Sequence, residues 1–165
     1  MDNETFYGKV VAISDQLYRT AKSILQDDES ARDSVQDLYL KLWEKRTTLH
    51  KIENMPSFAM KILRNLCLDK LRKKRELDLE TCDYSHIQDN TSIYEIVEQK
   101  NITKIIKQYI NQLPELQRTI VRLRDVEGYE IKEIAYITTS TENAVTANLS
   151  RARQKIRDYL LKLQV

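Results

Sequence analysis

The scarcity of glycine and proline is the feature that most limits what this chain can fold into. The 165 residues contain two glycines, Gly8 and Gly128, and two prolines, Pro56 and Pro114. A glycine-rich phosphate-binding loop or a dinucleotide-binding fingerprint needs several glycines close together, which this chain does not have. An all-β sandwich would need many more turn residues. The expected fold class is therefore all-α.

The composition is typical of a protein that folds in water rather than in a membrane. Hydrophobic residues make up 41% and charged residues 32%, so a core can be buried beneath a highly charged surface. No stretch approaches the roughly 18 apolar residues of a membrane span, and the acidic start of the chain is unlike a secretory signal. We expect a cytoplasmic protein without membrane insertion, in which Cys67 and Cys82 remain thiols.

The charges are distributed unevenly along the chain. Lys and Arg barely outnumber Asp and Glu, 27 against 25. Residues 61–75, however, hold seven basic residues and one acid, residues 76–98 hold seven acids and no Lys or Arg, and residues 142–165 hold five basic residues and two acids. A single basic helix is commonly just a solvated surface. Two basic regions separated by an acidic one suggest two contacts with a polyanion.

Helical periodicity predicts three helices in the first half of the chain. Apolar residues recur every three or four positions over residues 2–25, and again to about Arg46 in a helix that Asp28 or Ser30 can cap. A third helix begins at residues 54–56, with Pro56 in its first turn. At about 100° per residue, an apolar side and a basic side of this helix lie opposite each other. The apolar side holds Ala59, Ile62, Leu63 and Leu66, and the basic side holds Lys61, Arg64, Asn65, Arg72 and Arg75.

The second half of the chain begins with a polar, acidic stretch. Residues 76–92 show no sustained periodicity and are expected to form a linker. Helical patterns return over residues 93–113 and again from Pro114. Gly128 is expected to end the second of these helices, because glycine adopts the left-handed conformation without penalty.

Two closely spaced helical patterns follow Gly128, over residues 129–137 and 142–163, with Thr141 as the expected N-cap of the second. This is the layout of a helix-turn-helix, in which the second helix offers short polar side chains to base edges and arginines to phosphates. The candidate DNA-binding residues are Thr141, Asn143, Thr146, Ala147, Ser150, Arg151 and Arg153. On this pattern alone, an ordinary helical hairpin with a polar face is the alternative.

Segments in both halves of the chain resemble one protein family. Glu133–Ala135, Ala144–Val145 and Leu149–Arg153, with Leu113–Arg118 ahead of them, resemble the C-terminal domain of the extracytoplasmic-function (group IV) RNA polymerase sigma factors. Residues 31–43 resemble the polymerase-binding helix of that family, and Arg64–Arg72 resembles the helix that follows its promoter-melting loop. The order and spacing of these segments match the family over nearly the whole chain.

The resemblance implies two helical domains and their partners. Residues 1–75 correspond to sigma region 2, residues 76–92 to an acidic linker, and residues 93–165 to sigma region 4 with its helix-turn-helix. Region 2 would bind the β′ clamp helices of core RNA polymerase through Asp33, Gln36 and Asp37, although a solvated helix start is equally compatible with these residues. Region 4 would bind the β flap and the minus-thirty-five element of promoter DNA. Many relatives also bind an anti-sigma factor.

The resemblance further implies a site for the minus-ten promoter element. Residues 47–53 match the loop that holds a base flipped out of that element in the family. His50, Lys51 and Asn54 would line this loop. Lys61, Arg64 and Asn65 would hold the backbone of the opened strand beside it. The basic side of the third helix is therefore expected to be open rather than packed inward.

The chain departs from the family pattern in its last domain. Thr139 stands where glycine often makes the tight turn, and a β-branched residue tolerates positive φ poorly. Thr146 and Asn148 stand where several relatives carry Arg or Lys. Fewer charges mean weaker attraction to phosphates, so we expect this domain to bind DNA poorly by itself.

The sequence does not indicate a metal site or a catalytic site. The cysteines and histidines show no recognised zinc spacing, and no nucleophile stands with a base, so we expect no cofactor, no metal and no enzyme. The expected function is that of a sigma factor that directs promoter-specific transcription initiation. The alternative is a stand-alone helix-turn-helix regulator whose N-terminal half dimerises or senses a ligand. A helical adaptor that binds no nucleic acid is a third, weaker alternative.

Overall fold

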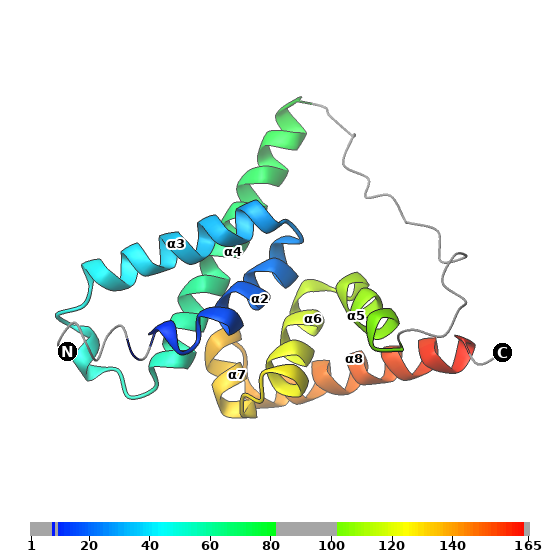
Figure 1. The fold of residues 1–165 in the computed structure, drawn as a ribbon. Helices are drawn as coiled ribbons and strands as arrows, with labels where there is room; N and C mark the ends of the chain where they lie inside the picture. Colours follow the sequence, from blue (N-terminus) through cyan, green and yellow to red (C-terminus); the bar gives the residue numbers. More distant parts are fainter. Residues whose placement is uncertain (1–7, 9, 82–101, 164–165) are drawn as a thin grey trace.

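Helices are the only regular secondary structure in the part of the chain that the structure describes, which is Gly8, residues 10–81 and residues 102–163. Figure 1 shows this computed structural model, with the N-terminal helices in blue to green and the C-terminal helices in yellow-green to red. The expected all-α class is confirmed. The helices form two groups, one on either side of residues 82–101.

The first domain consists of α2 (Ser14–Leu25), α3 (Asp28–Glu44), a short 3₁₀ turn η1 (Leu49–Lys51) and α4 (Met55–Thr81). These three α-helices contact one another in every pairing. Their apolar stripes meet in a core whose largest side chains are fully buried, among them Leu17, Leu38, Leu42, Met60 and Leu63. The single helix expected over residues 2–25 is wrong in part, because a turn at residues 12–13 precedes α2.

The caps of α3 and α4 follow from short polar side chains at their starts. The carboxylate of Asp27 accepts a 2.8 Å hydrogen bond from the backbone N–H of Ser30, so Asp27, rather than the expected Asp28 or Ser30, caps α3. Asn54 caps α4 in the same way, since its Oδ1 accepts a 3.0 Å bond from the N–H of Ser57. Pro56 lies in the first turn of α4, as expected.

Helix α4 is longer than expected. It continues to Thr81, so the first six residues of the predicted linker, 76–81, are helical. Its C-terminal end projects beyond the other helices of the first domain (Figure 1). The remainder of the predicted linker, residues 82–92, and the start of the next predicted helix lie outside the described residues.

The second domain consists of α5 (Ile102–Gln112), α6 (Glu115–Val121), a single π-helical turn η3 (Arg122–Val126), α7 (Ile131–Thr138) and α8 (Glu142–Leu163). Its core is formed mainly by Ile120, Leu123, Ile134, Ile137 and Val145, all fully buried or nearly so. Stacked rings of Tyr109 and Tyr159, 4.0 Å apart, join α5 to the C-terminal half of α8. Gly128 has φ +80° and follows η3, which confirms it as the end of that helical segment.

The helix-turn-helix is formed by α7 and α8. Thr139 ends α7 in the left-handed conformation, with φ 53°. Thr141 caps α8, because its hydroxyl accepts a 3.1 Å bond from the N–H of Ala144, as expected. Val145, Leu149 and Ala152 are buried, whereas Leu163 is 44% exposed, so the buried side of α8 stops short of its C-terminal end.

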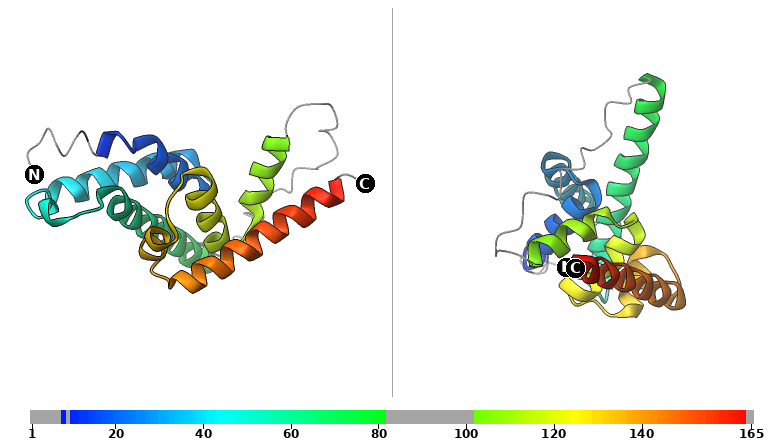
Figure 2. Two further views of the ribbon diagram at one scale, coloured as in Figure 1. Left: turned by 90° about the horizontal axis from the view of Figure 1, so that it is seen from below. Right: turned by 90° about the vertical axis from the view of Figure 1, so that its right-hand side faces the viewer.

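The two domains contact each other through four helices. Helix α4 packs against α7, and α2 packs against α6. The left view of Figure 2 shows α8 as a long helix whose C-terminal end points away from the first domain. The first domain therefore contacts α7, the first helix of the helix-turn-helix, rather than the exposed side of α8.

Candidate nucleic-acid interface

Polar contacts join the start of α4 to the start of α7. One carboxylate oxygen of Glu133 accepts a 2.8 Å bond from the backbone N–H of Glu130, which caps α7. Its other oxygen accepts bonds from Asn54 Nδ2 at 2.6 Å and from Ser57 Oγ at 3.2 Å. These hydrogen bonds, led by the one from the Glu130 backbone, lower the pKa of Glu133 below its usual value. Glu133 is thus an anion that both caps its own helix and binds the first domain.

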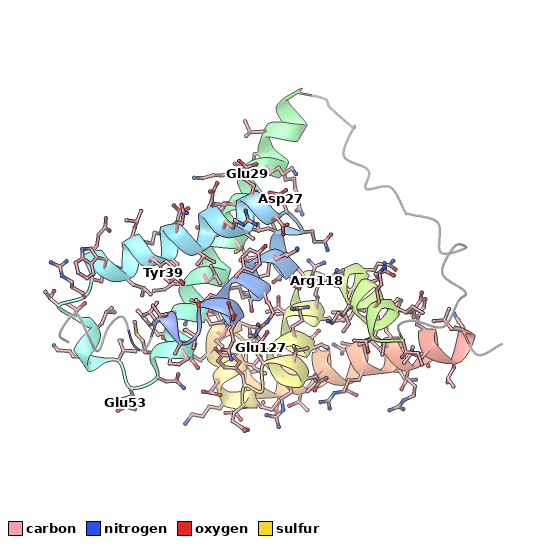
Figure 3. The ribbon with its side chains drawn as sticks, viewed as in Figure 1. Asp27, Glu29, Tyr39, Glu53, Arg118 and Glu127 are labelled. Carbon is pink, nitrogen blue, oxygen red and sulfur yellow. The ribbon has the colours of Figure 1, made fainter. Side chains whose placement is uncertain are left out.

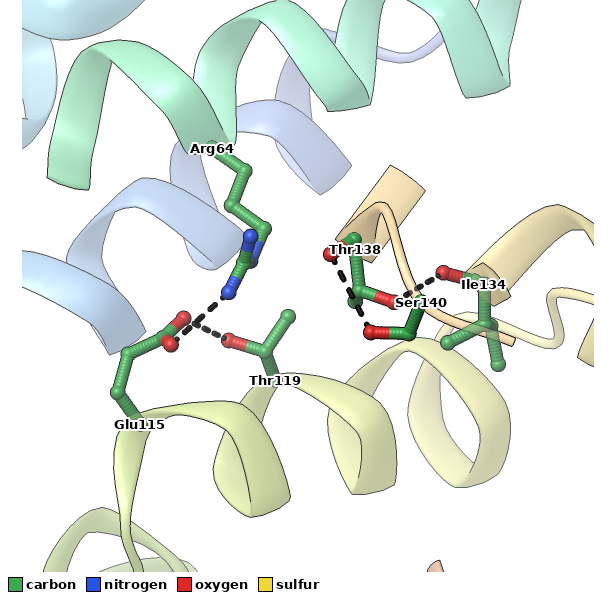
Figure 4. A network of polar contacts seen from close by, with 6 residues as sticks. All are labelled: Arg64, Glu115, Thr119, Ile134, Thr138 and Ser140. Carbon is green, nitrogen blue, oxygen red and sulfur yellow. Dashed lines mark hydrogen bonds and ion pairs between the residues drawn. The ribbon is translucent and has the colours of Figure 1, made fainter. Parts of the chain in front are cut away.

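One turn further along α4, two cations also face the second domain. The Lys61 ammonium lies 4.1 Å from the centroid of the Tyr136 ring. The Arg64 guanidinium donates a 3.0 Å bond to Glu115 at the start of α6, and Thr119 donates to the other oxygen of that carboxylate. Figure 4 shows Arg64 descending from α4 to Glu115 and Thr119. The Arg64 side chain is only 9% exposed, so this ion pair is largely shielded from water.

A second ion pair joins α2 to the end of η3. Arg19 donates two hydrogen bonds to Glu127, at 3.0 and 2.8 Å, and the Glu127 side chain is only 2% exposed. The hydrogen bond to Glu127 raises the pKa of Arg19. Nearby, burial lowers the pKa of Arg118 and Arg122, opposed by the charges of Glu115 and Glu127 respectively. Figure 3 labels Arg118 and Glu127 on the side of the second domain that faces α2.

We use the term domain interface for the residues that make these contacts. Two further hydrogen bonds belong to it, from Gln26 Nε2 to the backbone oxygen of Asn111 at 2.8 Å and from the Tyr129 hydroxyl to Gln16 at 3.3 Å. Its members are Gln16, Arg19, Gln26, Asn54, Ser57, Lys61 and Arg64 of the first domain, and Asn111, Glu115, Glu127, Tyr129, Glu133 and Tyr136 of the second.

The expected minus-ten residues fall into three groups. Asn54, Lys61 and Arg64 lie in the domain interface, so the expectation of an open basic side is wrong for this half of α4. Lys51 and Asn65 are exposed. The side chain of His50 lies outside the described set, although its backbone belongs to η1. The structure thus brings half of the six predicted residues together, but against another part of the same chain.

The expected minus-thirty-five residues lie along one side of α8 and its N-cap. Thr141, Asn143, Thr146, Ser150 and Arg151 are exposed, and Ala147 is half-buried. Arg151 has no ion pair with any described residue. Arg153, in contrast, is held by two hydrogen bonds to Asp125 in η3. Helix α8 therefore presents a continuous polar surface with one uncommitted arginine and one that is already paired.

Sequence comparisons place both domains in a known family. The profile of Sigma-70 region 2 matches residues 10–76, and that of Sigma-70, region 4 matches residues 103–156. The chain is 24% identical to the ECF RNA polymerase sigma factor SigW of Bacillus subtilis, over 98% of this chain and 92% of that protein. It is 30% identical to the RNA polymerase sigma factor SigV of the same organism, over 88% of this chain and 85% of SigV. The chain is an ECF sigma factor.

The fold agrees with this family. A solved structure of the sigma factor RpoE from Bartonella quintana, in complex with the anti-sigma factor NepR, matches with a TM-score of 0.78 over 95% of this chain and 97% of that one, at 23% identity. The share of a relative's length that the chain covers differs between relatives. The chain spans only 40% of the probable RNA polymerase sigma factor RfaY of Xanthomonas campestris. A sigma factor binds core RNA polymerase and promoter DNA, directs transcription initiation and is not an enzyme, which confirms the expected function class.

The polymerase-binding candidates of this sigma factor lie on α3. Asp33 and Gln36 are exposed. Asp37 is half-buried and lies 3.2 Å from the ammonium of Lys70 on α4. Two of the three side chains are therefore accessible to a partner, while the third is already paired within the domain.

Other kinds of site are not found in the described residues. No group of His, Cys, Asp and Glu among them could hold a metal ion, and no described helix is long and apolar enough to cross a membrane. Cys67 is a buried thiol whose pKa is raised by burial to about 11, so it is unreactive at neutral pH. Cys82, His86 and their surroundings lie outside the described residues.

Sequence reasoning missed the carboxylates of the domain interface. Glu115, Glu127 and Glu133 carry no signal that pairs them with residues 51 to 108 positions away. The spacing of Glu130 and Glu133 fits a helix start, so the capping role of Glu133 could have been predicted from the sequence. The hydrogen bonds that Glu133 accepts from Asn54 and Ser57 could not.

Proposed function

We propose that this chain is a group IV sigma factor that acts in the cytoplasm, with each domain contacting both polymerase and promoter. The first domain binds the β′ clamp helices through Asp33, Gln36 and Asp37. It binds the minus-ten element through its loop and α4, with His50, Lys51, Asn54, Lys61, Arg64 and Asn65. The second domain binds the β flap and reads the minus-thirty-five element with Thr141, Asn143, Thr146, Ala147, Ser150, Arg151 and Arg153.

The observation that carries this proposal is the pairing of regions 2 and 4 in one chain, with the polar side of α8 exposed. Short polar side chains near the N-terminus of a helix suit base edges in the major groove, and Arg151 suits a phosphate. The domains correspond to residues 1–75 and 93–165, joined by the acidic segment between them. An anti-sigma factor is included as a partner, because the similar RpoE structure contains one.

Run-off transcription with purified core polymerase tests the proposal. We expect promoter-specific transcripts only when the chain and the core enzyme are both present. A stand-alone regulator would instead bind its duplex tightly without polymerase and would produce no transcripts, and that result would overturn the proposal.

A double substitution tests the polymerase-binding assignment. Asp33→Ala with Gln36→Ala should weaken binding to core polymerase about tenfold or more, since exposed polar anchors at an interface contribute on the order of 1 kcal/mol each. Helicity by circular dichroism should not change. Glu29→Ala is the matched control, because Glu29 is also exposed on α3 but outside the proposed contact. Unchanged core binding in the double variant would mean that another surface of α3 or another helix docks on the polymerase.

A further inference from the structure

The charged side chains of the domain interface are divided by sign between the two domains. The first domain contributes the cations Arg19, Lys61 and Arg64, with hydrogen-bond donors from Gln26, Asn54 and Ser57. The second domain contributes the carboxylates of Glu115, Glu127 and Glu133, a backbone oxygen and the π face of Tyr136. The bond from Tyr129 to Gln16 is the exception. The second domain therefore presents the first with a row of anions, which is also what a nucleic-acid strand presents.

The same side chains cannot bind both partners at once. Arg64 is 9% exposed and its guanidinium is held by Glu115, so no phosphate can reach it in this arrangement. The Asn54 amide is held by Glu133, and the Lys61 ammonium lies over Tyr136. A strand that used these three donors would have to displace the second domain first.

We propose that the domain interface is autoinhibitory, with Glu115 and Glu133 occupying the donors of α4 that an opened DNA strand would otherwise bind. This inference rests on the proposed function of Asn54, Lys61 and Arg64. Binding of single-stranded DNA by the first domain then requires the two domains to separate. The affinity of the free protein for such DNA is reduced by the small fraction of molecules that are open.

The chemistry of the interface suits a contact that opens. Beside the buried apolar cluster that both domains share, it includes ion pairs and hydrogen bonds that water or phosphates can replace, and its cations gain equivalent partners in a nucleic acid. It is also imperfect, because the buried Nε of Arg64 has no hydrogen-bond partner among the described residues. The exposed side of α8 takes no part in it, so closure covers the first-domain surface alone.

Charge reversal at Glu115 provides the main test, with the full-length protein and a fluorescein-labelled oligothymidylate as the probe. Glu115→Lys places a cation opposite Arg64 and should open the domains. Asp158→Lys is the matched control, because Asp158 is exposed on α8, accepts a hydrogen bond from Gln154 of the same helix, and undergoes the same change of charge in the same domain. We expect Glu115→Lys to bind the oligonucleotide about tenfold more tightly than Asp158→Lys and to have a larger radius of gyration in small-angle scattering.

A second variant guards against misfolding and against a general charge effect. Tyr136→Ala removes the ring beneath Lys61 without changing charge, and Tyr136 is 45% exposed, so the fold should tolerate the loss. It should tighten oligonucleotide binding several-fold, because the exposed cation–π contact is one of several that hold the domains together. The gain of Glu115→Lys should also shrink when Arg64→Ala is added, since the released guanidinium is then missing.

The outcomes separate the two proposals. Equal oligonucleotide affinity and equal radius of gyration for Glu115→Lys and Asp158→Lys, with no gain from Tyr136→Ala, would overturn autoinhibition even if run-off transcription succeeds. Opening and tighter binding in the variants, combined with no transcripts from any of them, would support the closed arrangement while refuting the sigma-factor assignment of those residues.

Discussion

The two surfaces of this sigma factor that are proposed to contact DNA differ in what covers them. At the N-cap and along the first turns of α4, Asn54, Lys61 and Arg64 are bound by carboxylates and a ring of the second domain. On α8, Asn143, Ser150 and Arg151 are exposed. One chain therefore holds a covered surface suited to an opened strand and an uncovered surface suited to the major groove.

The difference follows from side-chain length and from where the acids lie. Lysine and arginine side chains on α4 are long enough to reach across to another helix, and three glutamates stand at helix ends on the facing side of the second domain. The polar side of α8 carries mostly short side chains, which satisfy themselves locally, as Thr146 does by donating to the Glu142 backbone oxygen at 2.9 Å. A covered surface thus arises where long cations meet carboxylates of the same chain, and an open one where the side chains are short.

The largest effect is expected from breaking the core of one domain and observing the other. Leu38 on α3 is fully buried, and Leu38→Ala should cost about 2–5 kcal/mol of unfolding free energy. Trp43, the one tryptophan of the chain, lies in the same domain and reports its unfolding by fluorescence. In urea, the fluorescence transition should move to lower concentration, while a second transition in far-UV circular dichroism stays near its wild-type midpoint.

Leu149→Ala is the matched change in the second domain, where Leu149 is 5% exposed on α8. It should shift the second transition more than the Trp43 transition, because Leu149 packs within the second domain, although the buried apolar residues of the two domains belong to one cluster. If both variants instead shift one common transition, the two domains unfold as a single unit, and the interface is stronger than its contacts indicate.

The next effect concerns the open surface alone and compares its two arginines. Arg151 is uncommitted among the described residues, whereas Arg153 is paired with Asp125. Each phosphate contact contributes about 0.9 to the slope of log affinity against log salt concentration. Arg151→Ala should therefore lower the slope for duplex DNA by about 0.9 and weaken binding several-fold, and Arg153→Ala should do less, because Arg153 must leave Asp125 to reach a phosphate. Fluorescence anisotropy titrations over a series of salt concentrations measure both slopes, and a larger loss from Arg153→Ala would show that Arg153 is the phosphate contact.

Much of the fold could be predicted from local signals. Apolar periodicity located every described α-helix but not the 3₁₀ turn η1, Pro56 and Asn54 marked the start of α4, and Gly128 marked the end of η3. Local signals failed at the start of α3, where several neighbouring side chains can act as the N-cap and Asp27 does. They also failed at residues 76–81, whose acidic sequence suggested a linker. Residues 76–81 are helical although acidic, because a helix already formed adds each further residue at little cost.

The site could be predicted only as two lists of residues. The helix-turn-helix and the basic side of α4 both follow from period and charge within one helix. The pairing of Arg64 with Glu115, 51 positions away, follows from how the domains pack, which no spacing in the sequence encodes. For the same reason the sequence could not reveal that half of the expected minus-ten residues are covered.

The smallest effect is expected at two non-glycine residues with positive φ, one in each domain, which are the two found among the described residues. Thr139 and Gln26 have φ 53° and 55°. A left-handed conformation costs roughly 1–2 kcal/mol for a residue with a Cβ, and glycine avoids this cost but loses more entropy on folding. Thr139→Gly should therefore stabilise the second domain by about 0.5–1 kcal/mol, measured as a shift of its urea midpoint. Thr139→Ala, which keeps the Cβ, is the control and should give no such gain.

Gln26→Gly relieves the same strain in the first domain but also removes the Gln26 bond to the Asn111 backbone oxygen across the domain interface. Its gain in stability should be smaller than that of Thr139→Gly, because a net hydrogen bond contributes about 0.5–1.5 kcal/mol. It should also open the domains slightly and tighten oligothymidylate binding, which Thr139→Gly should not do, since the backbone N–H of Thr139 donates to Tyr136 within its own domain. Equal stabilisation at both positions, with unchanged oligonucleotide binding, would mean that the Gln26 bond contributes nothing to closure.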